Sequence, residues 1–320
     1  MQNYHACVDV GGTKVAISLA DSQSVATRTL HARLAEPTAK EGNHDALAQQ
    51  IIRLIDASLA QMGAQREQVA SVGMSSCGPF VVRQGMVELA APNICGGLAG
   101  KARGLPNDWQ TALLQAPIAA IYPNVRVEND CIGALEAERR WGALQGVDNS
   151  AYVTWSTGIG MGLCVDGHVL RGKNGNAGHA GHMFVSDNND ALCGCGNIGD
   201  LEGLVAGNAI ERRFEQEAAI VFGAIRADSK RAEGQKALEI VHSLCRDMGR
   251  ALYNLIVTLD LQRISLGGSV FWHNQDIILP LLRQEIDGKL PSLTAGCELV
   301  PAGLGLQVGD FGALALTRAV

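Results

Sequence analysis

The chain has 320 residues, of which 47% are hydrophobic and 18% are charged. That length suits two domains of ordinary size, and that composition predicts a packed globular protein rather than a disordered one. The net charge of −6 and the pI of 5.8 argue against a nucleic-acid-binding surface. No apolar run reaches the length of a membrane span, and the first residues show no signal-peptide pattern, so we expect no nucleic-acid or membrane partner.

The nine cysteines are scattered along the chain, and several lie in apolar runs. An odd number of cysteines without an export signal predicts reduced thiols. We therefore expect a cytoplasmic protein.

Short apolar runs at 4–10 and 15–21 flank a glycine turn and predict a β-hairpin. A helix is predicted over 45–62 because apolar residues recur there at helical spacing: Leu47, Ile51, Ile52, Ile55 and Leu59. Strands are predicted at 69–76 and 124–130, and a helix follows the polar end of the second.

The second half begins with another strand, glycine turn and strand over 150–170. A helix over 236–260, a strand over 263–270 and a closing helix over 309–319 follow. Strands and helices alternate throughout, which predicts an α/β fold. Because the hairpin over 150–170 has the same pattern as the first, we expect two similar domains that face one another across a cleft.

The first hairpin turn has the sequence DVGGTK. Gly11 and Gly12 let the backbone approach a ligand and present N–H groups, while Thr13 adds a hydroxyl and Lys14 a charge. Asp9 could hold a hydrated Mg²⁺. The spacing matches neither a Walker A loop nor a dinucleotide-binding fingerprint, and an ordinary hairpin turn is the alternative.

Two further glycine turns follow predicted strands. STGIGMG contains Ser156, Thr157, Gly158 and Gly160, and LGGSV contains Gly267 and Gly268. Each alone could be a plain turn. Three such turns at strand ends together predict a nucleotide held by backbone amides.

The sequence VEND places a carboxylate, Asp130, at the end of a predicted strand, where α/β proteins bind ligands. Phosphoryl transfer to a hydroxyl requires a base, and Asp130 could accept that proton while Asn129 orients hydroxyls. The alternative is that Asp130 merely caps the following helix.

The segment from Gly178 to Glu202 contains two histidines and a CxC pair. His182, Cys193 and Cys195 are suitable zinc ligands, but structural zinc prefers four ligands and commonly CxxC spacing. The spacing alone does not decide between a zinc site and a polar loop that binds no metal.

Taken together, these motifs resemble the ROK family of repressors and sugar kinases over nearly the whole chain. DVGGTK and STGIGMG resemble its phosphate motifs, and VEND its catalytic motif. GMSSCGPF and APNICGG resemble its sugar-contacting loops. GNAGHAGH with CGCGNIGDLE resembles its signature, usually GxxGExGH followed by CxCGxxGCxE.

The resemblance implies two ribonuclease-H-like domains of the actin/hexokinase type with an interdomain cleft. We expect an N-terminal domain over 1–122, completed by a helix over about 308–320, and a C-terminal domain over 123–307. Asp130 falls on the position of the catalytic base. The positions that contact sugar in the family correspond to Gly78, Asn93, Asn129, His179, His182 and Glu202. Cofactors implied are ATP and Mg²⁺, and the protein is expected to form a homodimer.

Two departures from the family signature concern the metal and the sugar. The family's zinc positions correspond to His182, Cys193 and Cys195, but Asp200 replaces the third cysteine. A carboxylate can bind zinc, though it is a harder ligand than a thiolate. We therefore expect a structural Zn²⁺ held more weakly by these three residues and Asp200, and a site that has lost its metal is the alternative. His179 stands where the family usually has a sugar-binding glutamate, which resembles the N-acetylmannosamine kinase branch.

The sequence thus predicts an ATP-dependent kinase that phosphorylates a hexose or N-acylhexosamine, most often at the 6-OH, with Asp130 as general base. A sugar-binding or regulatory protein without kinase activity is the alternative. A sugar-sensing repressor is disfavoured, because the first phosphate strand begins near Met1 and no helix-turn-helix is expected ahead of it.

Overall fold

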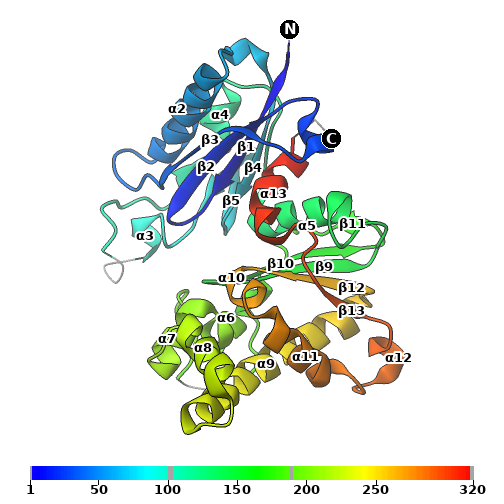
Figure 1. Cartoon of the computed structure of the whole chain (residues 1–320). Helices are drawn as coiled ribbons and strands as arrows, with labels where there is room; N and C mark the ends of the chain where they lie inside the picture. Colours follow the sequence, from blue (N-terminus) through cyan, green and yellow to red (C-terminus); the bar gives the residue numbers. More distant parts are fainter. Residues whose placement is uncertain (1, 100–103, 188–189, 318–320) are drawn as a thin grey trace. The chain divides into compact units, whose positions relative to one another are not determined.

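The computed structural model describes residues 2–99, 104–187 and 190–317, which form two compact units (Figure 1). Unit 1 contains the residues up to Ala137, the short segment Arg171–Asn176 and the residues from Gln307 onward. Unit 2 contains Glu138–Leu170 and Ala177–Leu306. Unit 1 therefore extends beyond the predicted boundary at residue 122, because the next strand pairs within its sheet.

The sheet of unit 1 has the order β3-β2-β1-β4-β8. Its strands are β1 (Tyr4–Val10), β2 (Lys14–Ala20), β3 (His31–Pro37), β4 (Val69–Ser76) and β8 (Val125–Asn129). The predicted hairpin is confirmed, since β1 and β2 are antiparallel. Strands β1, β4 and β8 are parallel, so their carboxyl ends meet at one edge of the sheet.

Alternation along β1 divides its side chains between the two faces of the sheet. Tyr4, Ala6, Val8 and Val10 join the apolar cluster that includes residues of α2 (Ala46–Gln61). The other face packs on α13 (Val308–Ala315), where a Cβ added to Gly73 of β4 would lie 2.3 Å from the Ala313 carbonyl oxygen. Asp9 belongs to the alternate set of residues, so its side chain points toward the face of the sheet that packs on α13.

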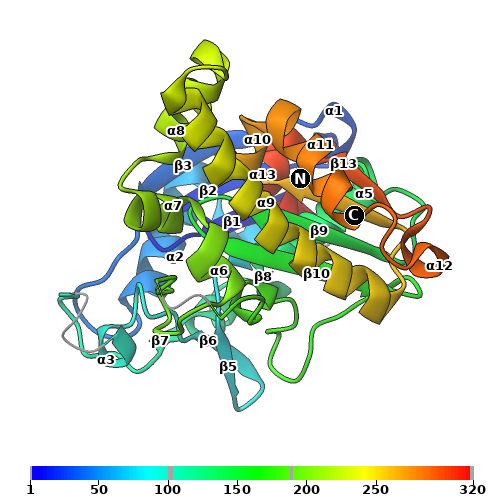
Figure 2. The same ribbon diagram turned by 90° about the horizontal axis from the view of Figure 1, so that it is seen from below.

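The remaining elements of unit 1 are shorter. Strands β5 (Phe80–Arg83), β6 (Met86–Leu89) and β7 (Ala112–Leu113) form a small antiparallel sheet (Figure 2). The helices are α1 (Ser24–Thr27), η1 (Arg66–Gln68), α3 (Gly96–Ala99), α4 (Gln115–Ala119) and α5 (Asp130–Trp141), which continues into unit 2. The final residues of the helix predicted over 309–319 lie outside the described part of the chain.

Unit 2 repeats the sheet pattern of unit 1, with the order β11-β10-β9-β12-β13. The strands are β9 (Ser150–Trp155), β10 (Ile159–Val165), β11 (His168–Val169), β12 (Arg263–Gly267) and β13 (Glu298–Pro301). Strands β9 and β10 form an antiparallel hairpin, while β9, β12 and β13 are parallel. Each sheet thus combines an antiparallel hairpin with parallel strands, and this shared pattern is the similarity that the two hairpins predicted.

Unit 2 also contains nine helical segments among its described residues. They are η3 (Ala180–His182), α6 (Leu201–Val205), α7 (Gly207–Phe214), α8 (Ala218–Asp228), α9 (Ala232–Leu259), α10 (Ser269–Trp272), α11 (Gln275–Ile286), α12 (Pro291–Thr294) and η4 (Gly305–Gln307), which crosses into unit 1. The long helix α9 runs alongside the sheet (Figures 1 and 2), and its apolar residues share a buried cluster with Val153 and Leu266. Among the described helices, none combines the length and apolarity needed to cross a membrane.

Two predicted elements differ in their limits. Helix α9 begins at Ala232, before the predicted residue 236. Strand β12 ends at Gly267 rather than at residue 270, because Gly268 has a φ of +85° and α10 starts directly after it. Glycine adopts this left-handed conformation without the steric cost that a Cβ adds.

Candidate active site and metal centre

The turn between β1 and β2 is held by hydrogen bonds on both sides. Within the turn, the Gly11 amide donates to the Lys14 carbonyl oxygen at 2.9 Å. The Thr38 hydroxyl donates to the Gly11 carbonyl oxygen at 2.7 Å, and the Thr38 amide donates to the Thr13 carbonyl oxygen at 3.1 Å. Thr38 was missed because it lies beyond β3 and carries no motif.

Asn93, one of the predicted sugar-contacting residues, lies against this turn. A Cβ added to Gly12 would lie only 1.9 Å from the Asn93 amide nitrogen. Gly12 is therefore needed for the close approach of the APNICGG loop. Unit 1 brings a predicted phosphate turn and a predicted sugar loop together.

Carboxylates gather beside this turn. Burial is the main cause that raises the pKa of Asp9 to about 6, and the charges of Asp130 and Asp310 raise it further, while Lys14 and Arg33 oppose them. Asp9 and Asp130 are thus close enough to interact, as their predicted roles require. Asp310 of α13 was missed because it lies near the other end of the chain.

Asn129 and Asp130 occupy the junction between β8 and α5. The Cys131 amide donates to Asn129 Oδ1 at 3.0 Å and to Asp130 Oδ1 at 2.8 Å. Because α5 begins at Asp130, Asn129 is the N-cap residue, and its Oδ1 satisfies the amide at the second helical position; Asp130 itself is the first helical residue. A carboxylate has two oxygens, so the contact of Oδ1 with the Cys131 amide does not prevent Asp130 from acting as a base through the other oxygen.

Unit 2 brings the other two glycine turns together. The Ser156 amide donates to the Gly158 carbonyl oxygen at 3.0 Å, and the Gly207 amide donates to the Ser156 carbonyl oxygen at 2.7 Å. A Cβ added to Gly268 would lie 2.5 Å from the backbone of Trp155, the residue before Ser156. The turns of STGIGMG and LGGSV are consequently adjacent.

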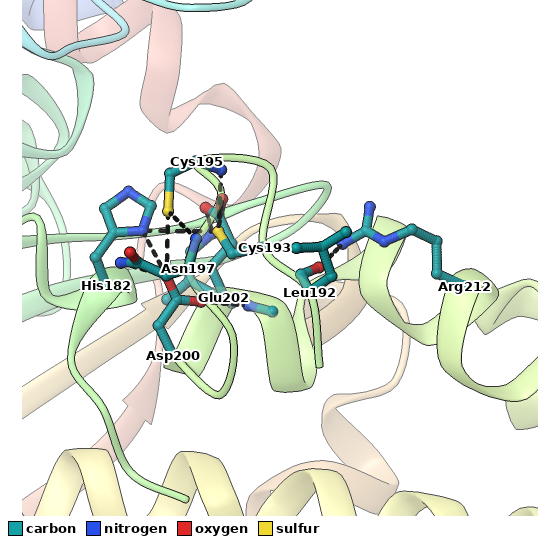
Figure 3. A network of polar contacts seen from close by, with 10 residues as sticks. His182, Leu192, Cys193, Cys195, Asn197, Asp200, Glu202 and Arg212 are labelled. Carbon is teal, nitrogen blue, oxygen red and sulfur yellow. Dashed lines mark hydrogen bonds and ion pairs between the residues drawn. The ribbon is translucent and has the colours of Figure 1, made fainter. Parts of the chain in front are cut away.

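The four predicted zinc ligands converge in unit 2 (Figure 3). One donor atom from each of His182, Cys193, Cys195 and Asp200 lies within 4.8 Å of the others. His182 Nδ1 is 3.0 Å from Asp200 Oδ2 and 3.7 Å from Cys193 Sγ, and Cys195 Sγ is 3.4 Å from Asp200 Oδ2. Tetrahedral zinc with N, O and S ligands needs donor atoms about 3.3–3.8 Å apart. The two cysteine contacts lie in that range, and the His182–Asp200 contact is shorter, at a hydrogen-bond distance.

Asp200 is fully buried and its two oxygens have separate contacts. Oδ1 accepts a hydrogen bond from the Gly203 amide at 2.8 Å and caps α6, whereas Oδ2 faces His182 and Cys195. Burial tends to raise the pKa of Asp200, but the hydrogen bonds that it accepts lower it below the usual value. Asp200 therefore favours the ionised form and also caps the start of α6.

Glu202 connects this cluster to the second phosphate turn. The Ile159 amide donates to Glu202 Oε2 at 3.0 Å, and Cys193 Sγ lies 3.4 Å from Glu202 Oε1. A Cβ added to Gly158 would lie 2.8 Å from Glu202 Oε2. The His179 ring centroid is 6.4 Å from that of His182, so the two predicted sugar-contacting histidines are neighbours.

The ROK family profile matches residues 5–320. The chain belongs to the ROK family. It is 29% identical to an N-acetylmannosamine kinase of Haemophilus influenzae, over 96% of this chain and 92% of that relative. It is 27% identical to a glucokinase of Aeropyrum pernix, over 82% of this chain and 84% of that relative.

Solved structures of ROK proteins show the same fold. A ROK hexokinase of Thermus thermophilus is 28% identical with a TM-score of 0.72, covering 99% of this chain and 97% of its own. A ROK glucokinase of Streptomyces griseus, solved with glucose and AMPPNP, is 25% identical with a TM-score of 0.69. The match covers 99% of this chain and 100% of the glucokinase chain. The predicted α/β fold of the actin/hexokinase type is confirmed.

Proposed function

We propose that this ROK protein transfers the γ-phosphoryl group of ATP to the 6-OH of a hexose or N-acylhexosamine. The observation that carries this proposal is the proximity of Asp9 and Asp130 in unit 1, next to the glycine turn of Gly11 and Gly12. A base and a phosphate-binding turn are the parts that phosphoryl transfer to an alcohol needs. The names of the relatives, sugar kinases from several organisms, agree with this activity.

In this mechanism Asp130 accepts the proton of the sugar hydroxyl while that oxygen attacks the γ-phosphorus, and ADP leaves. The amides of Gly11 and Gly12, with Thr13 and Lys14, contact phosphate oxygens. We propose the same role for the turns of unit 2 through Ser156, Thr157, Gly158, Gly160, Gly267 and Gly268. Mg²⁺, held by Asp9 through water, would neutralise phosphate charge.

For the sugar, we propose contacts from Gly78, Asn93, Asn129, His179, His182 and Glu202. A neutral imidazole at position 179 offers one donor and one acceptor, where a carboxylate offers acceptors alone. This change favours a sugar with a group that accepts a hydrogen bond, such as an N-acyl carbonyl. The similarity to an N-acetylmannosamine kinase agrees with that choice.

We further propose that His182, Cys193, Cys195 and Asp200 hold a structural Zn²⁺. The convergence of their donor atoms supports this role. The ion would fix the loop that carries His179 and Glu202, and it takes no part in the transfer. The family resemblance also predicts a homodimer, and the cysteine content predicts a cytoplasmic protein.

The test is an assay of ADP release from ATP with a panel of hexoses and N-acetylhexosamines. We expect turnover with at least one sugar, fastest with an N-acylhexosamine. Because His179 and Asp200 depart from the family signature, a sugar-binding protein without kinase activity is the second candidate. Sugar binding by calorimetry with no ADP release from any sugar would favour it over the kinase.

A further inference from the structure

The segment Arg171–Asn176, here named the crossing segment, belongs to unit 1 although the chain on both sides of it belongs to unit 2. The preceding residues form the β10–β11 hairpin, and the following residues lead directly to His179. The last two residues of the crossing segment, Gly175 and Asn176, open the GNAGHAGH signature, but that motif did not indicate the excursion. Its two ends contact different parts of unit 1, and both parts carry proposed active-site residues.

Arg171, at the first end, binds two glutamates. Its Nε lies 2.7 Å from Glu128 Oε1, and its Nη2 lies 3.0 Å from Glu136 Oε1. Arg126 contacts the same two oxygens, at 2.9 Å and 3.5 Å. Two guanidinium groups thus compensate two carboxylates, one of which, Glu128, is only 7% exposed. Hydrogen-bonded ion pairs of this kind fix the orientation of the groups they join.

The two glutamates flank the proposed base. Glu128 belongs to β8 and precedes Asp130 by two residues, while Glu136 lies on α5, which begins at Asp130. Arg171 therefore binds both the strand before Asp130 and the helix after it. Such a bridge restrains the angle at which the junction presents the Asp130 carboxylate.

Asn176, at the other end, pairs with the backbone of Phe80. The Phe80 amide donates to Asn176 Oδ1 at 2.8 Å, and Asn176 Nδ2 donates to the Phe80 carbonyl oxygen at 2.8 Å. One side-chain amide thus satisfies both backbone groups of the residue that ends the GMSSCGPF loop. That pair fixes the register of Gly78, two residues earlier, which is a proposed sugar contact.

We propose that the crossing segment is a positioning element for the phosphoryl transfer proposed above, on which this inference rests. Asn176 sets the position of the loop Gly78–Phe80 against the sugar, and Arg171 sets the junction that carries Asp130. Neither side chain is placed among the reacting groups. Displacement of a reacting group by about 1 Å can lower a rate about 100-fold, so restraints of this kind affect turnover strongly.

The two ends predict different kinetic defects. Asn176→Ala should raise the KM for the sugar about tenfold and leave the KM for ATP unchanged. Arg171→Ala should lower kcat about tenfold with a smaller change in the KM for the sugar, and Arg171→Lys should restore part of kcat because one contact can re-form. Sugar affinity of the Asn176→Ala protein, measured by calorimetry, should fall by the same factor as its KM rises.

Two control variants remove similar contacts elsewhere. Asn149→Ala removes a side-chain bond from the Asp166 amide at 2.9 Å in unit 2. Arg53→Ala removes a contact with Glu36 at 3.0 Å in unit 1. Both should keep wild-type kinetics. If Asn176→Ala does not fold, Asn176→Asp keeps the bond from the Phe80 amide, loses the donor to its carbonyl, and should show the same rise in the KM for the sugar.

The outcomes separate the two proposals. Wild-type protein that neither turns over nor binds any sugar overturns the proposed function and this inference with it. An active wild type whose crossing-segment variants behave like the two controls overturns the inference alone. The inference is also overturned if both KM values and kcat change in proportion to a loss of thermal stability, since a purely structural role would cause that.

Discussion

Asp130 combines a structural and a chemical role, because its Oδ1 accepts from the Cys131 amide in the first turn of α5 and it is the proposed base. Asparagine keeps that acceptor oxygen but cannot accept the proton. Asp130→Asn should therefore lower kcat about 10²–10⁴-fold with little change in the melting temperature. The matched control is Asp276→Asn, which removes only the exposed ion pair with Arg226. Near-normal turnover of Asp130→Asn would exclude Asp130 as the base.

Asp9 should make the stability of the protein fall as the pH rises. Its pKa in the folded chain is about 6, above the ordinary value of 3.8, so folding favours the protonated form. This stability is fully present below the unfolded pKa and is lost as the pH rises through about 6. Asp9→Asn should thus raise the free energy of unfolding near neutral pH by on the order of 2–3 kcal/mol.

That difference should shrink toward zero at low pH. Urea unfolding at several pH values, without Mg²⁺ or nucleotide, measures it. An equal effect of Asp9→Asn at every pH would show that Asp9 does not titrate in this range. The same variant should lose kinase activity, because asparagine holds a hydrated Mg²⁺ less well than a carboxylate.

At the scale of elements, the β1–β2 turn depends on the absence of a side chain at Gly12. A Cβ there would meet Asn93 at 1.9 Å, so Gly12→Ala must displace the side chain of Asn93. We expect the KM values for ATP and for the sugar to rise together, by about tenfold or more. Gly223→Ala is the control, since an added Cβ meets nothing within 4 Å. A rise in only one KM would show that the turn and the loop act separately.

The loop that ends at Asp200 shows a balance between metal binding and helix capping. Asp200→Cys supplies a softer thiolate ligand but removes the oxygen that accepts from the Gly203 amide. We expect tighter Zn²⁺ binding, measured by competition with a chromophoric chelator, because zinc favours thiolates. The metal-free variant should be less stable by about 1 kcal/mol, the usual cost of a lost N-cap. Unchanged affinity for Zn²⁺ would remove Asp200 from the ligand set.

At the scale of the whole molecule, the chain first passes from unit 1 to unit 2 at Glu138 and makes its last return after Leu306. Glu138 is fully buried and accepts hydrogen bonds from the Ser265 hydroxyl and from three amides, those of Ala143, Gly303 and Leu304. One carboxylate thus anchors residues close to both passages of the chain.

Removal of this carboxylate leaves four donors unsatisfied. Glu138→Ala should lower the free energy of unfolding by about 3–5 kcal/mol, because buried groups that lose their partners bear the full desolvation cost. Exposed Glu67 provides the control variant Glu67→Ala. Thermal or urea unfolding measures both. If Glu138→Ala lowers the free energy of unfolding by no more than Glu67→Ala does, the anchoring role is contradicted.

The sequence by itself determined the elements and the local motifs, because these depend on neighbours along the chain. Helical periodicity predicted α2, and short apolar runs predicted the strands β1 and β4. The glycine turns and the carboxylate of Asp130 were also visible as motifs.

Only the tertiary structure decided which distant residues meet. Thr38 on the first glycine turn, Asp310 beside Asp9, and Arg171 beside Glu128 carried no local signal. Asn176 and Phe80 lie in two separate motifs, and neither motif indicated that the two residues pair. Their contacts arise when separate strands and helices pack, and such packing depends on three-dimensional complementarity rather than on spacing along the chain. Asp200 is a further case. The sequence showed only that it replaces a cysteine, whereas the structure shows that Oδ1 accepts from the Gly203 amide and that Oδ2 faces His182.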